Sequence, residues 1–202
     1  MPPHRMHLTV LEIAQSKTPA EISGFVKPLR PHIQTMADYT LTHRPRLVKP
    51  AVSYDPTGVA LSFLTAAGEV FVSPTPCPAG EREGVAQEVV SGDAYTYHHL
   101  RGDVEDIVRK SGVRVEARYQ VPSAHITLGR YLETEDHETL EQRELWVRTV
   151  DDINTWLERE VWGVRSGDFI GEWIVGQERG LDLRCGTVWY GVGRSIMVGE
   201  GF

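Results

Sequence analysis

Alternating polar and apolar residues near the start of the chain predict a strand at about residues 6–11. Side chains along a strand point to opposite faces in turn. Leu8 and Val10 would therefore face a core, whereas His7 and Thr9 would share the other face, about 6 to 7 Å apart. This segment would present an imidazole and a hydroxyl side by side.

The same pattern recurs past the middle of the chain, at about residues 123–129. His125 and Thr127 would share one face of this second strand, and Ile126 and Leu128 would share the other. If the two strands lie side by side, they would line a groove with two imidazoles and two hydroxyls.

A helix is predicted soon after the first of these strands. Thr18 is expected at its N-cap, Pro19 at its first position and Glu21 three residues after the cap. Apolar residues then follow at helical spacing until Pro31 interrupts the pattern. We expect this helix to pack on the apolar side of the motif strand.

Strands joined by turns are predicted next, at residues 47–48, 51–54, 59–64 and 70–72. The intervening turn sequences are short, which favours antiparallel neighbours. Residues 74–84 contain three Pro and two Gly, and we expect them to form a loop and a hinge between two halves of the chain.

The second half repeats this order. A helix is predicted from about Asp93, as N-cap, to residues 111–112. The segments expected after it are a strand over 113–121, the second motif strand, a long helix over about 135–160, and strands at 173–175, 181–183 and 188–190. Since a motif strand, a helix and further strands occur twice, the sequence indicates a duplicated α+β unit.

Composition narrows the functional class. The 202 residues are 41% hydrophobic and 24% charged, as in globular proteins, and we expect one domain over residues 1–202. No apolar run is long enough for a membrane span, and we expect a cytoplasmic monomer that does not bind membranes, with a nuclear location left open. The net charge of −7 argues against a broad surface for duplex DNA, but is compatible with a nucleotide or an RNA end.

The sequence contains more His-x-Thr matches than a random order of the same residues would produce. With 8 His and 15 Thr among 202 residues, a random order would give about 0.6 His-x-Thr matches, or about 0.1 if x and the residue after Thr must both be apolar. The chain contains three His-x-Thr matches. The third match, at residues 137–139, lies in an acidic, helix-like stretch, and we interpret it as coincidental. The alternative for His7 and His125 is that both are hydrogen-bonded structural residues.

Paired His-x-Thr-apolar strands far apart in one small chain are the signature of two-histidine (2H) phosphoesterases, and this chain resembles that superfamily. Its members include LigT-type RNA 2′,3′-cyclic phosphodiesterases, cyclic nucleotide phosphodiesterases and 2′,5′-oligoadenylate-cleaving enzymes. The segments HLTVLEI, YTYHHLRGD and VPSAHITLGRY further resemble a fungal branch. The resemblance implies a two-lobed α+β fold whose antiparallel sheets line a central cleft, with one motif from each lobe.

The residues themselves suit phosphodiester hydrolysis. One neutral imidazole would take a proton from water as the water attacks a 2′,3′-cyclic phosphate, and a protonated imidazole would give one to the departing ribose oxygen. The hydroxyls of Thr9 and Thr127 would donate hydrogen bonds to phosphate oxygens. Neither a metal nor another cofactor is required. Analogy with the family favours His125 as base and His7 as acid, an assignment that the residues alone leave open.

Other candidate residues have weaker support. Tyr97 is in helical phase with apolar residues, which favours core packing over a role as the wall of a nucleoside pocket. His98 and Arg101 lie in the same turn region and are candidates for binding phosphate, although a solvated helix face explains them equally well. Residues 43–46 and Lys49 form a short basic cluster, for which a charged loop is the simpler interpretation.

The leading hypothesis is therefore a metal-independent phosphodiesterase that opens 2′,3′-cyclic phosphates of nucleotides or RNA ends. Cleavage of 2′,5′- or 3′,5′-linked oligonucleotides is an alternative within the superfamily. A nucleotide-binding module without turnover is a third, which the intact His and Thr at both motifs disfavour, because binding alone does not need two proton-transfer groups.

Overall fold

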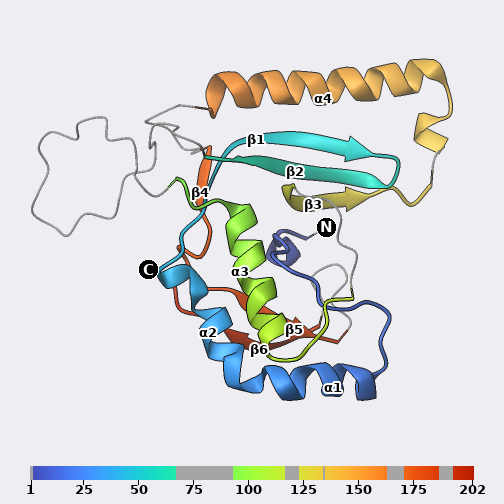
Figure 1. Ribbon diagram of the computed structural model, residues 1–202. Helices are drawn as coiled ribbons and strands as arrows, with labels where there is room; N and C mark the ends of the chain where they lie inside the picture. The colour runs from blue at the N-terminus through green and yellow to red at the C-terminus, as the bar shows by residue number, and fades with distance from the viewer. Residues whose placement is uncertain (1, 67–92, 117–122, 134, 163–170, 187–192) are drawn as a thin grey trace, which may run out of the picture.

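The computed structural model describes residues 2–66, 93–116, 123–133, 135–162, 171–186 and 193–202, and all structural statements concern these residues. The fold is mixed α+β with antiparallel strands, as the sequence predicts (Figure 1). The larger sheet has the order β3-β2-β1-β4, with β1 at Arg46–Asp55, β2 at Gly58–Thr65, β3 at Ala124–Arg130 and β4 at Glu172–Ile174. A second sheet pairs β5, Asp182–Cys185, with β6, Arg194–Val198.

Four α-helices accompany the sheets in the described residues: α1 at Pro19–Leu29, α2 at Ile33–Ala37, α3 at Tyr97–Lys110 and α4 at Leu140–Glu160. Short 3-10 turns lie at Pro3–Arg5, Arg30–His32, Tyr39–Leu41 and Glu135–His137. The predicted start of α1 is confirmed. Glu21 N–H donates to Thr18 Oγ1 at 3.3 Å, and Thr18 N–H donates to Glu21 Oε2 at 2.8 Å.

The turn between β1 and β2 is also confirmed. Asp55 Oδ1 accepts hydrogen bonds from the backbone N–H groups of Thr57, at 2.7 Å, and Gly58, at 3.0 Å. Gly58 is required there because a Cβ at this position would lie 2.4 Å from the carbonyl oxygen of Gly129. This tight turn sets the register of β1 against β2 and brings β3 close on the far side of β2.

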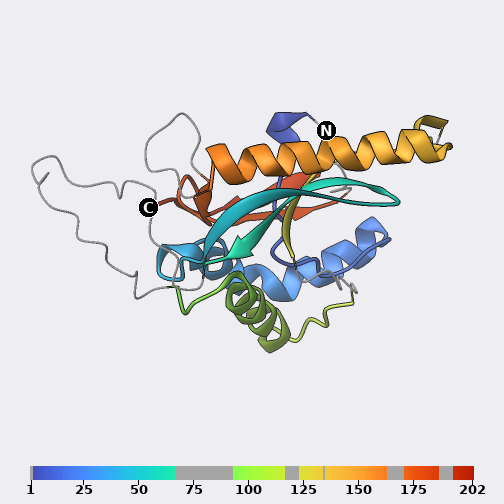
Figure 2. The same ribbon diagram turned by 90° about the horizontal axis from the view of Figure 1, so that it is seen from above.

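Helix α4 covers the free edge of β1. The side-chain amide of Asn154 accepts a hydrogen bond from Val52 N–H at 2.7 Å and donates one to Val52 C=O at 3.0 Å. These two bonds replace those of a neighbouring strand, since β4 pairs only with residues 46–48 of β1. Figures 1 and 2 show α4 running along this side of the sheet.

The core lies between the sheets and helices α1 to α3. Its cluster of buried side chains comprises Leu29, Ile33, Met36, Leu47, Tyr97, Leu100, Val104, Val108, Val113, Ala124 and Val175. Leu8 and Val10 pack against this cluster, as expected for the apolar side of the first motif. The opposite side chains of the motif are therefore directed away from the core.

The predicted N-cap of α3 is wrong. Thr96, rather than Asp93, caps the helix. Asp93 is buried and forms an ion pair with Arg46, whose guanidinium also binds Glu172. The predicted end is confirmed, because Gly112 follows the helix with a φ of 83°, in the left-handed region that glycine adopts readily.

Other boundaries differ from the predictions. The long helix begins at Leu140 with Thr139 as its cap, after a separate 3-10 turn, instead of at about residue 135. Residues 113–116 contain no strand, and β6 was not predicted. The predicted strands at 70–72 and 188–190, the hinge at 74–84 and most of 113–121 lie outside the described residues. No helix in the described ranges has the length and apolar character needed to cross a membrane.

Candidate active site

The two His-x-Thr motifs are neighbours in the structure. His125 and Thr127 lie on β3, as predicted. The first motif is not the regular strand expected at residues 6–11, because it joins the sheet only through one antiparallel bridge between Leu8 and Ile126. Ile126 also pairs with Leu61 of β2, so the first motif lies along the other edge of β3.

The bridge determines how the motif residues face one another. In an antiparallel pair centred on Leu8 and Ile126, His7 is opposite Thr127 and Thr9 is opposite His125. All four side chains then share the face of the sheet that Leu8 and Ile126 do not occupy. The arrangement is reciprocal, since each imidazole lies across from the hydroxyl of the other motif.

The accessibility of these side chains suits contact with a ligand. His7 is exposed, and Thr9, His125 and Thr127 are half-buried. Neither imidazole is enclosed within the apolar core. Both can therefore exchange protons with a molecule bound on this face of the sheet.

The two histidines also share a hydrogen-bond pattern. His7 Nδ1 lies 2.9 Å from the carbonyl oxygen of Arg5, and His125 Nδ1 lies 3.3 Å from that of Ser123. A carbonyl oxygen can only accept, so the contact of His7 places the hydrogen on Nδ1. His125 Nδ1 also lies 3.1 Å from Ser123 Oγ, which can donate or accept, and its contact with the Ser123 carbonyl is made when Nδ1 carries the hydrogen. In the neutral ring, Nε2 then holds the lone pair that accepts a proton, and in the charged ring it holds the proton to be donated.

Tyr97 supports the first motif from within the core. Its side chain is 0% exposed, and its hydroxyl donates a hydrogen bond to the carbonyl oxygen of Thr9 at 2.6 Å. The favoured interpretation from the sequence, core packing, is therefore confirmed. A side chain without exposed surface does not form the wall of a nucleoside pocket, although its hydroxyl connects α3 to the segment that carries Thr9.

Replacing Tyr97 by phenylalanine is expected to lower the free energy of unfolding by about 1 kcal/mol, because the Thr9 carbonyl loses its hydrogen-bond donor while the ring still packs. The first motif has only one bridge to β3, so we expect a larger fractional loss in kcat than in KM. Urea denaturation and steady-state kinetics measure the two effects. A variant with wild-type kinetics and lowered stability would show that Tyr97 does not position the motif.

The structure gives the positions of the other predicted binding residues but does not test their contact with a ligand. His98 is exposed and Arg101 is half-buried, both on α3, and their contact with a phosphate stays a prediction. The basic cluster does not form a common surface. Arg46 is buried against two carboxylates, and the Arg44 guanidinium lies over the ring of Phe202, 3.8 Å from its centroid.

The third His-x-Thr match has a different structural role, as interpreted from its sequence. His137 ends a 3-10 turn and packs edge-on against the rings of Tyr131 and Trp146. Thr139 is the N-cap of α4, and its Oγ1 accepts a hydrogen bond from Gln142 N–H at 3.2 Å. These two residues do not lie on a strand.

A second group of titratable side chains lies around the start of α3. The Tyr95 hydroxyl donates to Asp103 Oδ2 at 2.6 Å. This bond lowers the pKa of the Asp103 carboxyl, and burial, followed by the hydrogen bond to Asp103, raises the pKa of Tyr95. Asp103 is thus held ionised and Tyr95 neutral, which is a stable pairing rather than a proton-transfer arrangement.

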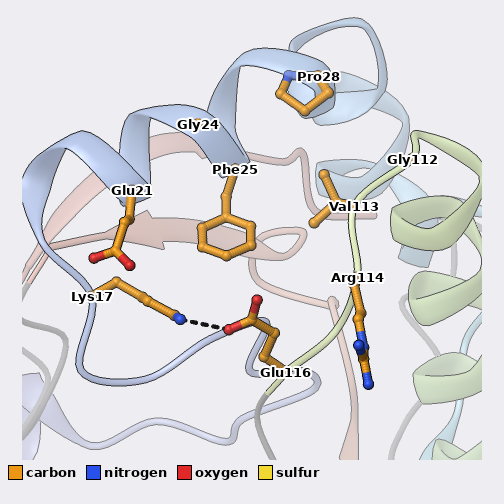
Figure 3. A pocket seen from close by; sticks show the side chains of 9 residues that line it. All are labelled: Lys17, Glu21, Gly24, Phe25, Pro28, Gly112, Val113, Arg114 and Glu116. Carbon is orange, nitrogen blue, oxygen red and sulfur yellow. Dashed lines mark ion pairs between the residues drawn. The ribbon is translucent and has the colours of Figure 1, made fainter.

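A hollow of about 330 Å³ lies away from the motifs, between α1 and the segment after α3 (Figure 3). The ring of Phe25 points into it. Lys17 Nζ pairs with Glu116 Oε2 at 2.6 Å across its edge, and this contact raises the pKa of Lys17. The lining contains none of the four motif residues, so the hollow is separate from the candidate active site.

In the described ranges, no three His, Cys, Asp or Glu side chains gather in a way that would hold a metal ion. Cys185 lies half-buried on β5, and Cys77 is outside these ranges. Comparison with protein-family models, with curated proteins and with solved structures finds no match to this chain.

Proposed function

We propose that the protein is a metal-independent phosphodiesterase that hydrolyses 2′,3′-cyclic phosphates of nucleotides or RNA ends. The observation that carries the proposal is the bridge between Leu8 and Ile126. It joins two motifs from distant parts of the chain and gives each histidine a threonine of the other motif as its neighbour. A pair of unrelated structural histidines would not require this reciprocal arrangement.

In the proposed reaction, the P–O bond to one ribose oxygen breaks as a new P–O bond to water forms. His125 Nε2 takes the proton from the attacking water, and His7 Nε2 gives a proton to the departing ribose oxygen. The Thr9 and Thr127 hydroxyls donate to the non-bridging oxygens, where negative charge increases in the transition state. The product is a phosphate monoester. Exchanging the roles of the two histidines would yield the other regioisomer.

The two-lobed form of the 2H fold is part of the proposal. It is supported by the two antiparallel sheets and by the position of the motifs on neighbouring segments. We also propose a cytoplasmic monomer whose partners are nucleotide or RNA-end substrates. The net charge of −7 is consistent with a ligand held by a few local contacts rather than a long duplex.

The test is incubation with each of the four nucleoside 2′,3′-cyclic monophosphates in the presence of EDTA. We expect conversion to a single phosphate regioisomer, with a bell-shaped dependence of kcat/KM on pH, because one group must be deprotonated and another protonated. The matched control is the double variant His7→Ala, His125→Ala. Loss of activity on chelation, or equal activity of the double variant, would contradict the proposal. Activity only on oligonucleotides would redirect it to 2′,5′- or 3′,5′-linkages.

A further inference from the structure

The face of the larger sheet that carries the four motif side chains, called the motif face below, continues onto β2. Ser62 of β2 pairs directly with His125 of β3. Paired residues in a sheet point to the same face, so the Ser62 side chain lies on the face that carries His125. His125 therefore has a hydroxyl residue on each side, with Thr9 on the N-terminal segment and Ser62 on β2.

The hydrogen-bond pattern shows that Ser62 and His125 form the closer type of antiparallel pair. Val52 uses both its N–H and its C=O to bind Asn154 outside the sheet, so its partner Leu61 directs its own groups toward β3. The adjacent pair of Ser62 and His125 is then not hydrogen-bonded through its backbone. The Cβ atoms of directly opposite residues are about 4.5–5.5 Å apart, and pairs without backbone hydrogen bonds lie at the short end of this range.

The hydroxyl of Ser62 is oriented by a second serine. Ser53 Oγ on β1 lies 2.6 Å from Ser62 Oγ, and it lies 3.4 Å from the carbonyl oxygen of Ala60. Either serine can be the donor in the 2.6 Å contact. The Ala60 carbonyl can only accept, so Ser53 directs its single hydrogen either at this carbonyl or at Ser62. When Ser53 donates to Ser62, the Ser62 hydrogen points at an acceptor on the sheet face. Hydroxyls linked in this way polarise one another and become better donors.

We propose that Ser62 is a third hydroxyl donor to the scissile phosphate, on the β2 side of His125, and that Ser53 is its positioning residue. This inference rests on the proposed function. Ser62 would donate to the non-bridging phosphate oxygen that lies beside His125, whereas Thr127 would bind from β3 and Thr9 from the N-terminal segment. Ser62 is half-buried and Ser53 is exposed, so both are accessible from the sheet face.

The test compares Ser62→Ala with Ser62→Thr on all four cyclic nucleotides. We expect Ser62→Ala to lower kcat/KM by about 10- to 100-fold, as when a hydrogen bond to a charged group is lost. The loss should be equal for the four bases, since the phosphate is common to them, and Ser62→Thr should restore most of it. Ser53→Ala should cause a smaller loss, about 3-fold, with Ser53→Thr restoring the activity.

The matched control is Ser23→Ala on the exposed face of α1, which should keep wild-type kinetics. Unchanged kcat/KM for Ser62→Ala, while activity still requires both histidines, would overturn the assignment of Ser62 alone. A loss that differs among the four bases would also overturn it, since it would place the hydroxyl on the nucleoside. If the wild-type protein hydrolyses none of the substrates, the proposed function and this inference both fail.

Discussion

Replacing His7 or His125 by alanine is expected to lower kcat/KM on a 2′,3′-cyclic phosphate by about 10²- to 10⁴-fold, the usual contribution of a positioned acid or base. The proposed reaction needs one proton removed and one delivered, and the two rings divide these steps. Thr9→Ala and Thr127→Ala should cost less, because each removes one hydrogen-bond donor to the phosphate. Steady-state kinetics with the purified variants measure these losses.

His137→Ala is the matched control, since it alters the same residue type in the same His-x-Thr spacing. Its ring packs against Tyr131 and Trp146, in a different environment from the motif face, so kcat/KM should stay within about 2-fold of wild type. The urea midpoints of the His7 and His125 variants should match that of wild type, because neither ring belongs to the buried cluster. Loss of folding in these variants would instead identify both residues as structural.

Replacing Arg46 by alanine is expected to lower the free energy of unfolding by about 3–5 kcal/mol, the largest effect on stability that we predict. The guanidinium is 3% exposed, with Nε 3.1 Å from Asp93 Oδ1 and Nη1 2.9 Å from Glu172 Oε2. Its removal takes away the cation that the two buried carboxylates share. Arg46→Met should not rescue stability, since it restores volume and no charge.

The control for this prediction is Arg109→Ala. Arg109 pairs with Glu105 one turn away on α3, and its side chain is 66% exposed. Such surface pairs contribute only about 0.3–0.5 kcal/mol. Chemical denaturation of both variants provides the comparison. Similar midpoints for the Arg46 and Arg109 variants would show that the buried ion cluster does not stabilise the fold.

The sequence predicts those helices, strands and turns that are determined by residues close together in the chain. The capping box at Thr18 and Glu21 marks the start of α1, and Asp55 to Gly58 marks the turn between β1 and β2. The apolar alternation around His125 predicts β3. In each case the residues that determine the structure lie within a few positions of one another, so the sequence pattern contains the necessary information.

The features that the sequence does not predict correctly depend on contacts between residues far apart in the chain. Asp93 has the side chain of a good N-cap, but it binds Arg46, and no local pattern predicts that pairing. The sequence also gives no indication of the roles proposed for Ser53 and Ser62, because an isolated serine in a strand carries no functional signal. Their closeness to each other and to His125 depends on the register of three strands.

The sequence by itself determined the residue types, the His-x-Thr spacing and the common face within each motif, because the two-residue period of a strand is a local property. The tertiary structure decided that the first motif attaches to β3 through a single bridge, in the antiparallel sense, and that each histidine faces the threonine of the other motif. It also decided that Tyr97 supports Thr9 from the core. These features depend on packing between segments far apart in the chain, where burial and hydrogen bonding outweigh local preference.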